Sequence, residues 1–326
     1  MSTILVLTNL ADGDVDTPTL ELLTLARELG NPVALIVGDA PSAAVTTLGR
    51  YGVTAIHALD CPQLAGSLVT ARSALVADAA SAVGADVVLL AAGLENAEVA
   101  ALVAAALGAA LVTDAVAAAT VDGALRVTKV IWAGRHTVEA DVRTPRAVLT
   151  VKANAITPSP DAAGGTVLAV EVGTRTHETA RDAVVTSLVA DASTGGPRLS
   201  DASVVVAGGR GTDGDFTGVV ALAELLGGAV GASRAAVDAG WIGIGTQVGQ
   251  TGRTVSPDLY VAVGISGAIQ HVAGMRTARR IVAVNSDPDA PIHRIADLGV
   301  VGDLAVILPA AVERLRAHAA LEGASR

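Results

Sequence analysis

Aromatic residues are scarce in this chain of 326 residues. Two Trp, two Tyr and one Phe make up 2% of the sequence, whereas apolar residues make up 51%. The apolar content is therefore carried by Ala, Val, Leu and Ile, beside 35 Gly. So few stacking side chains argue against binding of single-stranded nucleic acid. An apolar chain with only 17% charged residues is not disordered as a whole, and its length suits two domains.

Cysteine and net positive charge are also lacking. The single thiol, Cys61, excludes an intramolecular disulfide and favours a reducing cytoplasm. There are 22 Lys and Arg against 32 Asp and Glu, which gives a net charge of -10. This balance disfavours nucleic acid and anionic membrane surfaces as partners, because both attract basic stripes.

Long hydrophobic runs are absent as well. The longest stretch without a charged residue is 259–275, which is interrupted by Ser266, Gln270 and His271. A membrane-spanning helix needs about 20 mainly apolar residues, so this stretch predicts no span. The start of the chain has no basic segment followed by an apolar run, which predicts no signal or transit peptide.

The first half alternates short apolar runs with longer helical patterns. This alternation predicts a parallel sheet whose strands are buried on both faces under covering helices. Strands are expected at 4–8, 32–37, 55–59, 86–90 and 167–172, with helices at 16–30, 41–52, 64–83 and 96–107.

Residues 124–153 change to a period of two, which is typical of strands with one solvent-facing side. We therefore expect antiparallel edge strands at 125–130, 137–142 and 148–152. The small, turn-forming residues 192–197 then predict a linker. The expected organisation is α/β, with an N-terminal domain over 1–191 and a C-terminal domain over 192–326, each built on a mainly parallel, doubly wound sheet.

In the second half, four expected strands end in small or polar residues. The strands are 203–207, 259–263, 281–284 and 298–301, and a last amphipathic helix is expected over 310–321 with Arg314 and Arg316 facing solvent. The first strand runs into Gly208-Gly209-Arg210-Gly211 and a helix over 216–226, an arrangement that cradles phosphates. Ser266 is expected to cap a helix and to leave the amides of Gly267 and Ala268 free for an anion.

The carboxyl ends of parallel strands meet at one edge, where open sheets bind ligands. Each polar residue there also has a plainer interpretation: His271 as a core histidine, and Asn285 and Asp303 as turn or cap residues. Taken together, the pattern suits a nucleotide or dinucleotide and leaves NAD, FAD and thiamine diphosphate open. The residues expected to converge are Arg210, Gln250, Thr251, Ser266, Gln270, His271, Asn285 and Asp303.

Four segments carry a family resemblance. Residues 230–238, 247–252, 259–271 and 285–292 closely resemble the alpha subunit of electron transfer flavoprotein, in a match that is nearly continuous from 204 to 309. The resemblance implies a Rossmann-like second domain that binds FAD, a heterodimer with a beta subunit that usually holds AMP, and a cytoplasmic place in fatty acid beta-oxidation. It implies an electron carrier without substrate turnover, which accepts electrons from acyl-CoA and other dehydrogenases and passes them to a membrane quinone reductase.

The resemblance also implies a set of FAD contacts, and neither a catalytic nor a metal-ligating residue. Arg234 with Ser233 is expected over the isoalloxazine ring, and Thr251 near N5 and O4. His271 is expected near O2, and Arg210 at the pyrophosphate. The remaining expected contacts are Val248, Gly249 and Gln250 beside the ring, Ser266, Gly267, Ala268, Ile269 and Gln270 at the pyrophosphate, and Asn285, Asp303 and Leu304 around the adenosine.

Positive charge near the ring would raise the first reduction potential of the flavin. Arg234 is the expected permanent charge, and His271 would add to it if protonated. Two other hypotheses remain at this point. One is an NAD- or thiamine-diphosphate-dependent enzyme, for which Thr212–Asp215 loosely resembles a metal-diphosphate motif; the other is a nucleotide-binding regulatory module.

Overall fold

A computed structural model describes residues 2–61, 64, 67–132, 135–161, 164, 165, 167–174, 183, 185–187 and 196–324. The chain divides into two compact units: residues 1–130 with 137–189, and residues 131–136 with 190–326. The expected linker at 192–197 lies largely outside the described residues, so the boundary at 191/192 stays a proposal.

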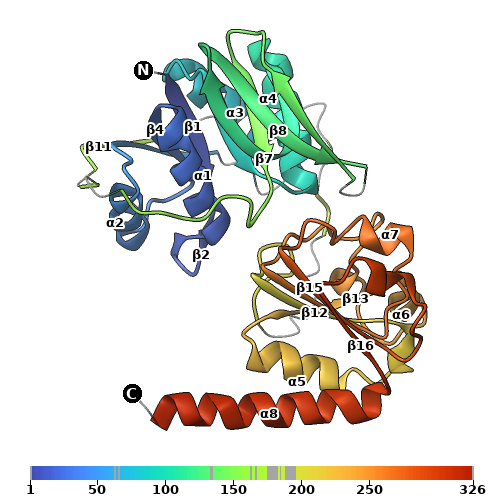
Figure 1. Cartoon of the computed structure of the whole chain (residues 1–326). Helices are drawn as coiled ribbons and strands as arrows, with labels where there is room; N and C mark the ends of the chain where they lie inside the picture. The colour runs from blue at the N-terminus through green and yellow to red at the C-terminus, as the bar shows by residue number, and fades with distance from the viewer. Residues whose placement is uncertain are drawn as a thin grey trace. The chain divides into compact units, whose positions relative to one another are not determined.

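The first unit is built on a nine-stranded sheet in the order β11-β5-β4-β1-β6-β10-β7-β8-β9 (Figure 1). All neighbours from β11 to β7 are parallel, and β8 runs antiparallel to β7. The strands are β1 (Thr3–Thr8), β4 (Asn31–Val37), β5 (Ala55–Asp60), β6 (Val87–Ala91), β7 (Ala110–Val121), β8 (Ala124–Ile131), β9 (His136–Asp141), β10 (Ala147–Val151) and β11 (Ala169–Thr174). A small hairpin joins β2 (Leu10–Ala11) and β3 (Asp14–Val15).

Helices cover both faces of this sheet, as the buried apolar runs predicted. One core cluster joins the sheet to α1 (Thr17–Leu29) and α2 (Ser42–Arg50), and the other joins it to α3 (Thr70–Ala82) and α4 (Leu94–Leu107). Helix α1 begins where the sequence places a cap, since the Asp16 carboxylate accepts a hydrogen bond from the Thr19 amide and Pro18 stands in the first turn. Local sequence signals therefore fix this helix start.

Two predictions for the first unit were wrong. The third alternating run, 148–152, was expected to be an antiparallel edge strand, but β10 lies between β6 and β7, is parallel to both and is buried throughout. Its Thr150 resembles a solvent-facing residue in the sequence, yet its hydroxyl is buried and accepts the amide of Asp114. The second is the helix expected over 64–83, which is shorter and is α3 in the structure. Strand β7 was not predicted, because the Ala-rich sequence gave no sign of it.

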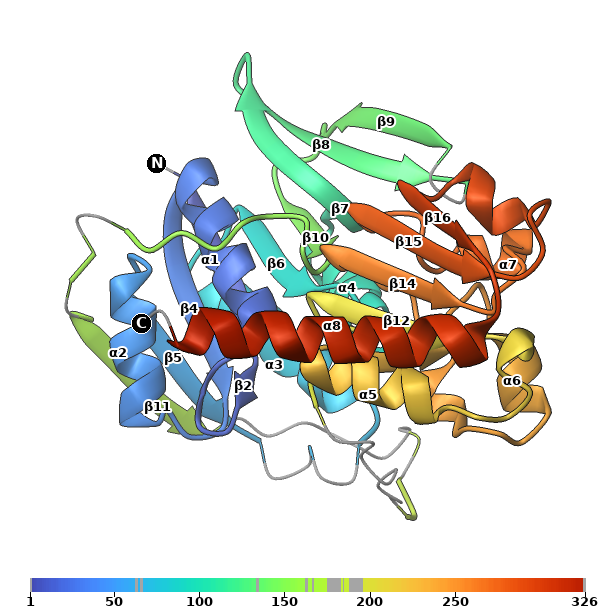
Figure 2. The ribbon, with the colours of Figure 1, turned by 60° about the horizontal axis from the view of Figure 1, so that its bottom comes forward.

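The second unit holds a five-stranded parallel sheet in the order β13-β12-β14-β15-β16. Its strands are β12 (Val204–Gly208), β13 (Ala229–Ala232), β14 (Leu259–Val263), β15 (Arg280–Asn285) and β16 (Leu298–Val301). One face packs on α5 (Thr217–Leu225) and α8 (Leu304–Ala324), which lie side by side in Figure 2. Short segments cover the other face, including α7 (Ile269–Val272) and the 3-10 turn Pro291–Arg294.

The four strands and the helix pattern expected for this unit are confirmed, with Arg314 and Arg316 exposed. The sequence missed the short strand β13 and the helix α6 (Arg234–Asp238), and the helix expected after Ser266 begins only at Ile269, as α7. Helix α8 also begins earlier than expected and continues through Pro309. Among the described residues, no helix has the length and apolar character needed to cross a bilayer.

Candidate functional site

The polar residues expected to converge follow the carboxyl ends of the second sheet. Gly208 pairs in register with Ala232 on one side and with Val263 on the other. Val263 pairs with Val284, and the next residue, Asn285, pairs with Val301. The loops that follow all five strands therefore start at one edge of the sheet. Strand β13, which the sequence did not predict, ends at this edge as well, and Ser233 is the residue that follows it.

The centre of this edge is the switch point between β12 and β14, where the strand order reverses. Open parallel sheets bind ligands in this crevice. The two loops touch here through their backbones: the Gly209 amide donates to the Val263 carbonyl at 2.8 Å, and the Gly211 amide to the Gly264 carbonyl at 3.0 Å. A Cβ on Gly209 would lie 2.3 Å from the Gly264 oxygen. Only a residue without a side chain allows this close approach.

Hydrogen-bond donors at this edge have no acceptor within the described part of the chain. The amides of Ser266, Gly267 and Ala268 donate to no described protein atom, and Ser266 and Ala268 are exposed. Arg210, two residues after the end of β12, is exposed, and its guanidinium makes no hydrogen bond or ion pair with a described residue. The expected cap at Ser266 was wrong, because α7 begins at Ile269 without a side-chain cap. Free amides and an unpaired cation suit a phosphate group.

Residues 247–253 form a hydrogen-bonded turn at the same edge. The Val248 amide donates to the Ala232 carbonyl of β13, and the Gln250 amide donates to the Gln270 carbonyl, at 2.9 and 2.8 Å. Gln247 is buried, and its side-chain amide donates to the exposed Thr251 hydroxyl at 3.0 Å. Gln247, which the sequence did not single out, thus orients Thr251.

Asn285 and Asp303 act as turn and cap residues, which is the plainer of the two interpretations that the sequence left open. The Asn285 amide group donates to the Ile265 carbonyl at 2.9 Å, and its oxygen accepts the Asp287 amide at 3.0 Å. Asp303 accepts the Ala305 amide at 2.9 Å, at the start of α8. These side chains shape the edge, while Leu304 packs against Gly264.

At the β13 end of the edge, Ser233 and Arg234 begin α6. The Ser233 hydroxyl accepts the Ala236 amide and caps the helix. The Arg234 side chain is 67% exposed, and its Nε donates to the Asp238 carboxylate at 3.1 Å. The positive charge of Arg234 is therefore partly balanced by Asp238, a residue that the sequence analysis did not consider.

His271 is buried at 6% exposure and lies against the 247–253 turn. Its Nε2 lies 2.9 Å from the hydroxyl of Tyr260, while Nδ1 is buried and makes no hydrogen bond with a described residue. Burial lowers the pKa of His271 to about 4, against a smaller raising effect of the Val248 backbone. The imidazole is neutral at pH 7, so the expectation that His271 adds positive charge is not supported.

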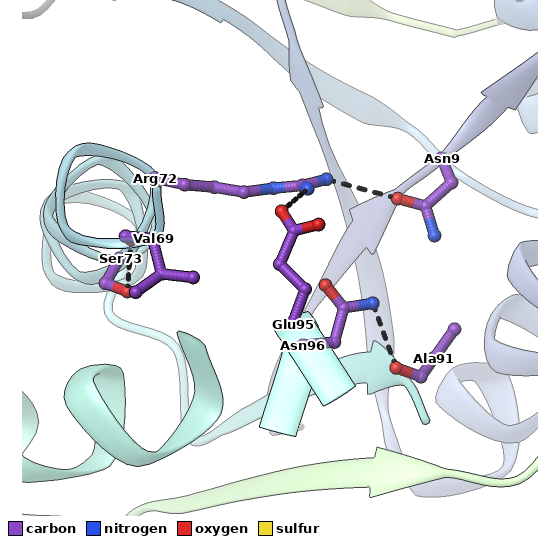
Figure 3. A network of polar contacts seen from close by, with 7 residues as sticks. All are labelled: Asn9, Val69, Arg72, Ser73, Ala91, Glu95 and Asn96. Atoms are coloured by element: carbon purple, nitrogen blue, oxygen red, sulfur yellow. Dashed lines mark hydrogen bonds and ion pairs between the residues drawn. The ribbon is translucent and has the colours of Figure 1, made fainter. Parts of the chain in front are cut away.

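At the corresponding edge of the first sheet, polar side chains pair with one another (Figure 3). Between β1 and β6, Arg72 donates to Glu95 at 2.8 Å and to Asn9 at 3.3 Å. Asn96 donates to the Ala91 carbonyl at 3.0 Å. The arginine charge at this edge is therefore balanced internally, in contrast to Arg210, and the open donors lie in the second unit.

Metal-dependent chemistry finds no support in the residues that the structure describes. They contain no cluster of three or more His, Cys, Asp or Glu side chains that would hold a metal ion. In the Thr212–Asp215 turn, the Asp215 carboxylate accepts the Thr217 amide at 2.9 Å. Hydrogen bonding by the Thr217 side chain, and then by its amide, lowers the pKa of Asp215 and is typical of a turn before a helix.

Comparison with known proteins decides the family. Residues 4–193 match the family model of the electron transfer flavoprotein domain, and residues 198–276 match that of the electron transfer flavoprotein FAD-binding domain. The electron transfer flavoprotein subunit alpha of Mycobacterium tuberculosis (strain ATCC 25618 / H37Rv) is 42% identical over 322 residues, which cover 98% of this chain and 99% of the relative.

The chain belongs to the electron transfer flavoprotein alpha-subunit family. The alpha subunits of Mycobacterium leprae (strain TN) and Bacillus subtilis (strain 168) are 40% and 32% identical, over 98% and 96% of this chain and 99% and 97% of their own lengths. The second unit accordingly carries the FAD-binding domain of the family, and its cofactor is FAD. The alpha-subunit family resemblance expected from the sequence is confirmed.

The edge described above has the donors that FAD requires. The glycine loops bring open amides and the unpaired Arg210 to the switch point, as a pyrophosphate needs. The buried Nδ1 of His271 offers a polar atom without a partner in the described chain, as the carbonyl edge of a flavin ring needs. Sequence reasoning missed Gln247, Tyr260 and Asp238, and the only available signal was their placement inside the segments that resemble the family.

Proposed function

We propose that this chain is the alpha subunit of a heterodimeric electron carrier that holds FAD at the carboxyl edge of its second sheet. Two features support this: the match of 198–276 to the FAD-binding domain, and the open donors at the β12–β14 switch point. The bound flavin supplies one- and two-electron redox chemistry. The named alpha-subunit relatives support pairing with a beta subunit. That this partner holds AMP is what the family resemblance implies.

The roles of individual residues follow from chemistry and from the family resemblance. Arg210 and the amides of 266–268, with Ile269 and Gln270 beside them, bind the pyrophosphate. Arg234 and Ser233 lie at the isoalloxazine ring, and Gln247 holds Thr251 toward it. Asn285, Asp303 and Leu304 enclose the adenosine, chiefly by shaping the β14, β15 and β16 loops.

The donors and acceptors of electrons are inferred at the level of class. We infer that the heterodimer accepts electrons from acyl-CoA and other dehydrogenases and passes them to a membrane quinone reductase. The chain has no substrate turnover of its own. The first unit contacts the beta subunit, and the carrier works in the cytoplasm, where its buried thiol, Cys61, stays reduced.

Coexpression with the gene for the partner subunit tests the proposal. The purified complex is expected to be yellow and to release one FAD per heterodimer on denaturation. Reduction by an acyl-CoA dehydrogenase with its substrate should bleach the flavin. A quinone reductase supplied with a quinone, which takes up the electrons, should then restore the yellow colour. A colourless complex that binds NAD or thiamine diphosphate would instead support the enzyme hypothesis.

Arg210→Gln should weaken FAD binding by about 10- to 150-fold. The variant removes a cation that has no partner in the described chain, and a charge-assisted hydrogen bond to a phosphate contributes about 1.5–3 kcal/mol. Equilibrium dialysis of the coexpressed complex measures the dissociation constant. Arg314→Gln, which removes an exposed arginine on α8, is the matched control. Equal affinities for the two variants would remove Arg210 from the site.

A further inference from the structure

The starting observation is a buried hydroxyl with a single partner. Tyr260 lies in the middle of β14, is 0% exposed and packs in an apolar cluster with Val205 and Ile281. Its hydroxyl makes one hydrogen bond within the described chain, to Nε2 of His271 at 2.9 Å. A buried hydroxyl hydrogen without an acceptor is costly, and this nitrogen is the one acceptor that the described residues offer it.

The direction of this hydrogen bond decides which nitrogen of the imidazole carries the hydrogen. A neutral histidine carries one ring hydrogen, and the nitrogen that accepts a hydrogen bond is the one without it. If Nε2 accepts from Tyr260, the hydrogen lies on Nδ1. The same nitrogen is buried and has no hydrogen-bond partner among the described residues.

We propose that Tyr260 is a positioning residue that donates to Nε2 of His271 and fixes it as a neutral imidazole with its hydrogen on Nδ1. This deepens the proposed function and rests on it in one respect: in the loaded protein, Nδ1–H is the donor presented to the flavin. The ring then meets the cofactor as a neutral hydrogen-bond donor, and Arg234 is left as the cation at that end of the edge.

The Tyr260 hydrogen bond also holds helix α7 in place. His271 lies on the short α7, and its backbone lies against Gly249 in the turn that presents Gln250 and Thr251. The Tyr260 hydrogen bond ties α7 to the rigid β14. Loss of the hydroxyl frees the ring to exchange its hydrogen between the two nitrogens.

Nitrogen NMR of the coexpressed heterodimer with 15N-labelled histidine tests the proposal. Ring 15N shifts distinguish a protonated from an unprotonated nitrogen, and His271→Gln assigns the signals. We expect a protonated Nδ1 and a bare Nε2 at pH 7, and a change in the Nδ1–H signal when FAD is removed. In Tyr260→Phe, the form with hydrogen on Nε2 should become populated, whereas Tyr51→Phe, in the first unit, should leave His271 unchanged.

The spectrum of the wild-type protein by itself shows which nitrogen of His271 carries the hydrogen. The proposal can therefore be tested even if Tyr260→Phe does not fold. A hydrogen on Nε2 in the wild type, or an unchanged His271 pattern in a folded Tyr260→Phe protein, would overturn it. An Nδ1–H signal that does not respond to FAD would overturn its flavin-directed part. A heterodimer that holds no FAD would refute the proposed function, while the FAD-free spectrum would still report which nitrogen of His271 carries the hydrogen.

Discussion

Gly209→Ala should abolish tight FAD binding and reduce the free energy of unfolding by about 3 kcal/mol. The added Cβ would lie 2.3 Å from the carbonyl oxygen of Gly264 and 2.7 Å from its carbonyl carbon. Both are backbone atoms, so no side chain can rotate away to relieve the overlap. The β12 and β14 loops must therefore separate, and the hydrogen bond from the Gly209 amide to Val263 is strained or lost.

Separation of these loops should affect FAD more than any single side-chain loss. Arg210 and the amides of 266–268 lie on the two loops that move apart, so their donors no longer converge on one phosphate group. We expect FAD affinity to fall by well over tenfold, which corresponds to more than about 1.4 kcal/mol. Chemical denaturation measures stability, and FAD release on dilution measures affinity.

Gly243→Ala is the matched control, because a Cβ at this position has no atom within 4 Å and the backbone there is not left-handed. This variant should retain both stability and FAD. Wild-type affinity in Gly209→Ala would show that the contact between the two loops does not position the pyrophosphate donors.

Arg234→Ala should lower the first one-electron reduction potential of bound FAD by about 40–170 mV. A unit charge about 4 Å from the ring contributes roughly 1 kcal/mol in bulk water and roughly 4 kcal/mol at an effective dielectric constant of 20. For one electron, about 59 mV corresponds to a tenfold change in equilibrium. Since the side chain is 67% exposed and paired with Asp238, we expect a value in the lower half of this range.

Asp238→Asn gives the opposite sign and makes the test specific. Removal of the carboxylate leaves Arg234 without its balancing charge, so the potential should rise, and high salt should reduce the shift. Arg234→Lys keeps the charge and should retain most of the wild-type potential. Spectroelectrochemistry of the FAD-loaded heterodimer measures all three variants. An unchanged potential in Arg234→Ala, with FAD still bound, would exclude Arg234 as the charge at the ring.

The sequence predicted a strand correctly where an uninterrupted apolar run is buried on both faces of the sheet. The apolar runs at β1, β4, β6 and β14 are buried on both faces, so their composition alone indicates parallel strands. Residues 148–152 misled the prediction, because Thr150 and Lys152 give the run an alternating pattern. The Thr150 hydroxyl is satisfied by the Asp114 amide inside the sheet, and this partner from β7 is invisible in the local sequence.

The sequence predicted where the candidate site lies better than it predicted the charge of the side chains in it. Glycines and polar residues after successive strands correctly indicated a shared edge, because parallel strands must end together. Burial decided the state of His271, and an ion pair with Asp238 decided how much of the charge of Arg234 is balanced. Neither effect follows from residue type, since both depend on neighbours brought in by the fold.

The sequence by itself determined the class of this protein: two α/β sheets, a glycine-rich second half and the motifs of the electron transfer flavoprotein family. These properties are local, because they depend on periodicity, turn residues and short motifs. Only the tertiary structure decided which donors are free. Arg72 and Arg210 both lie where parallel strands end. Arg72 donates hydrogen bonds to Glu95 and Asn9, whereas no described residue pairs with Arg210. A charge is available to a ligand only where the folded chain leaves it without a partner.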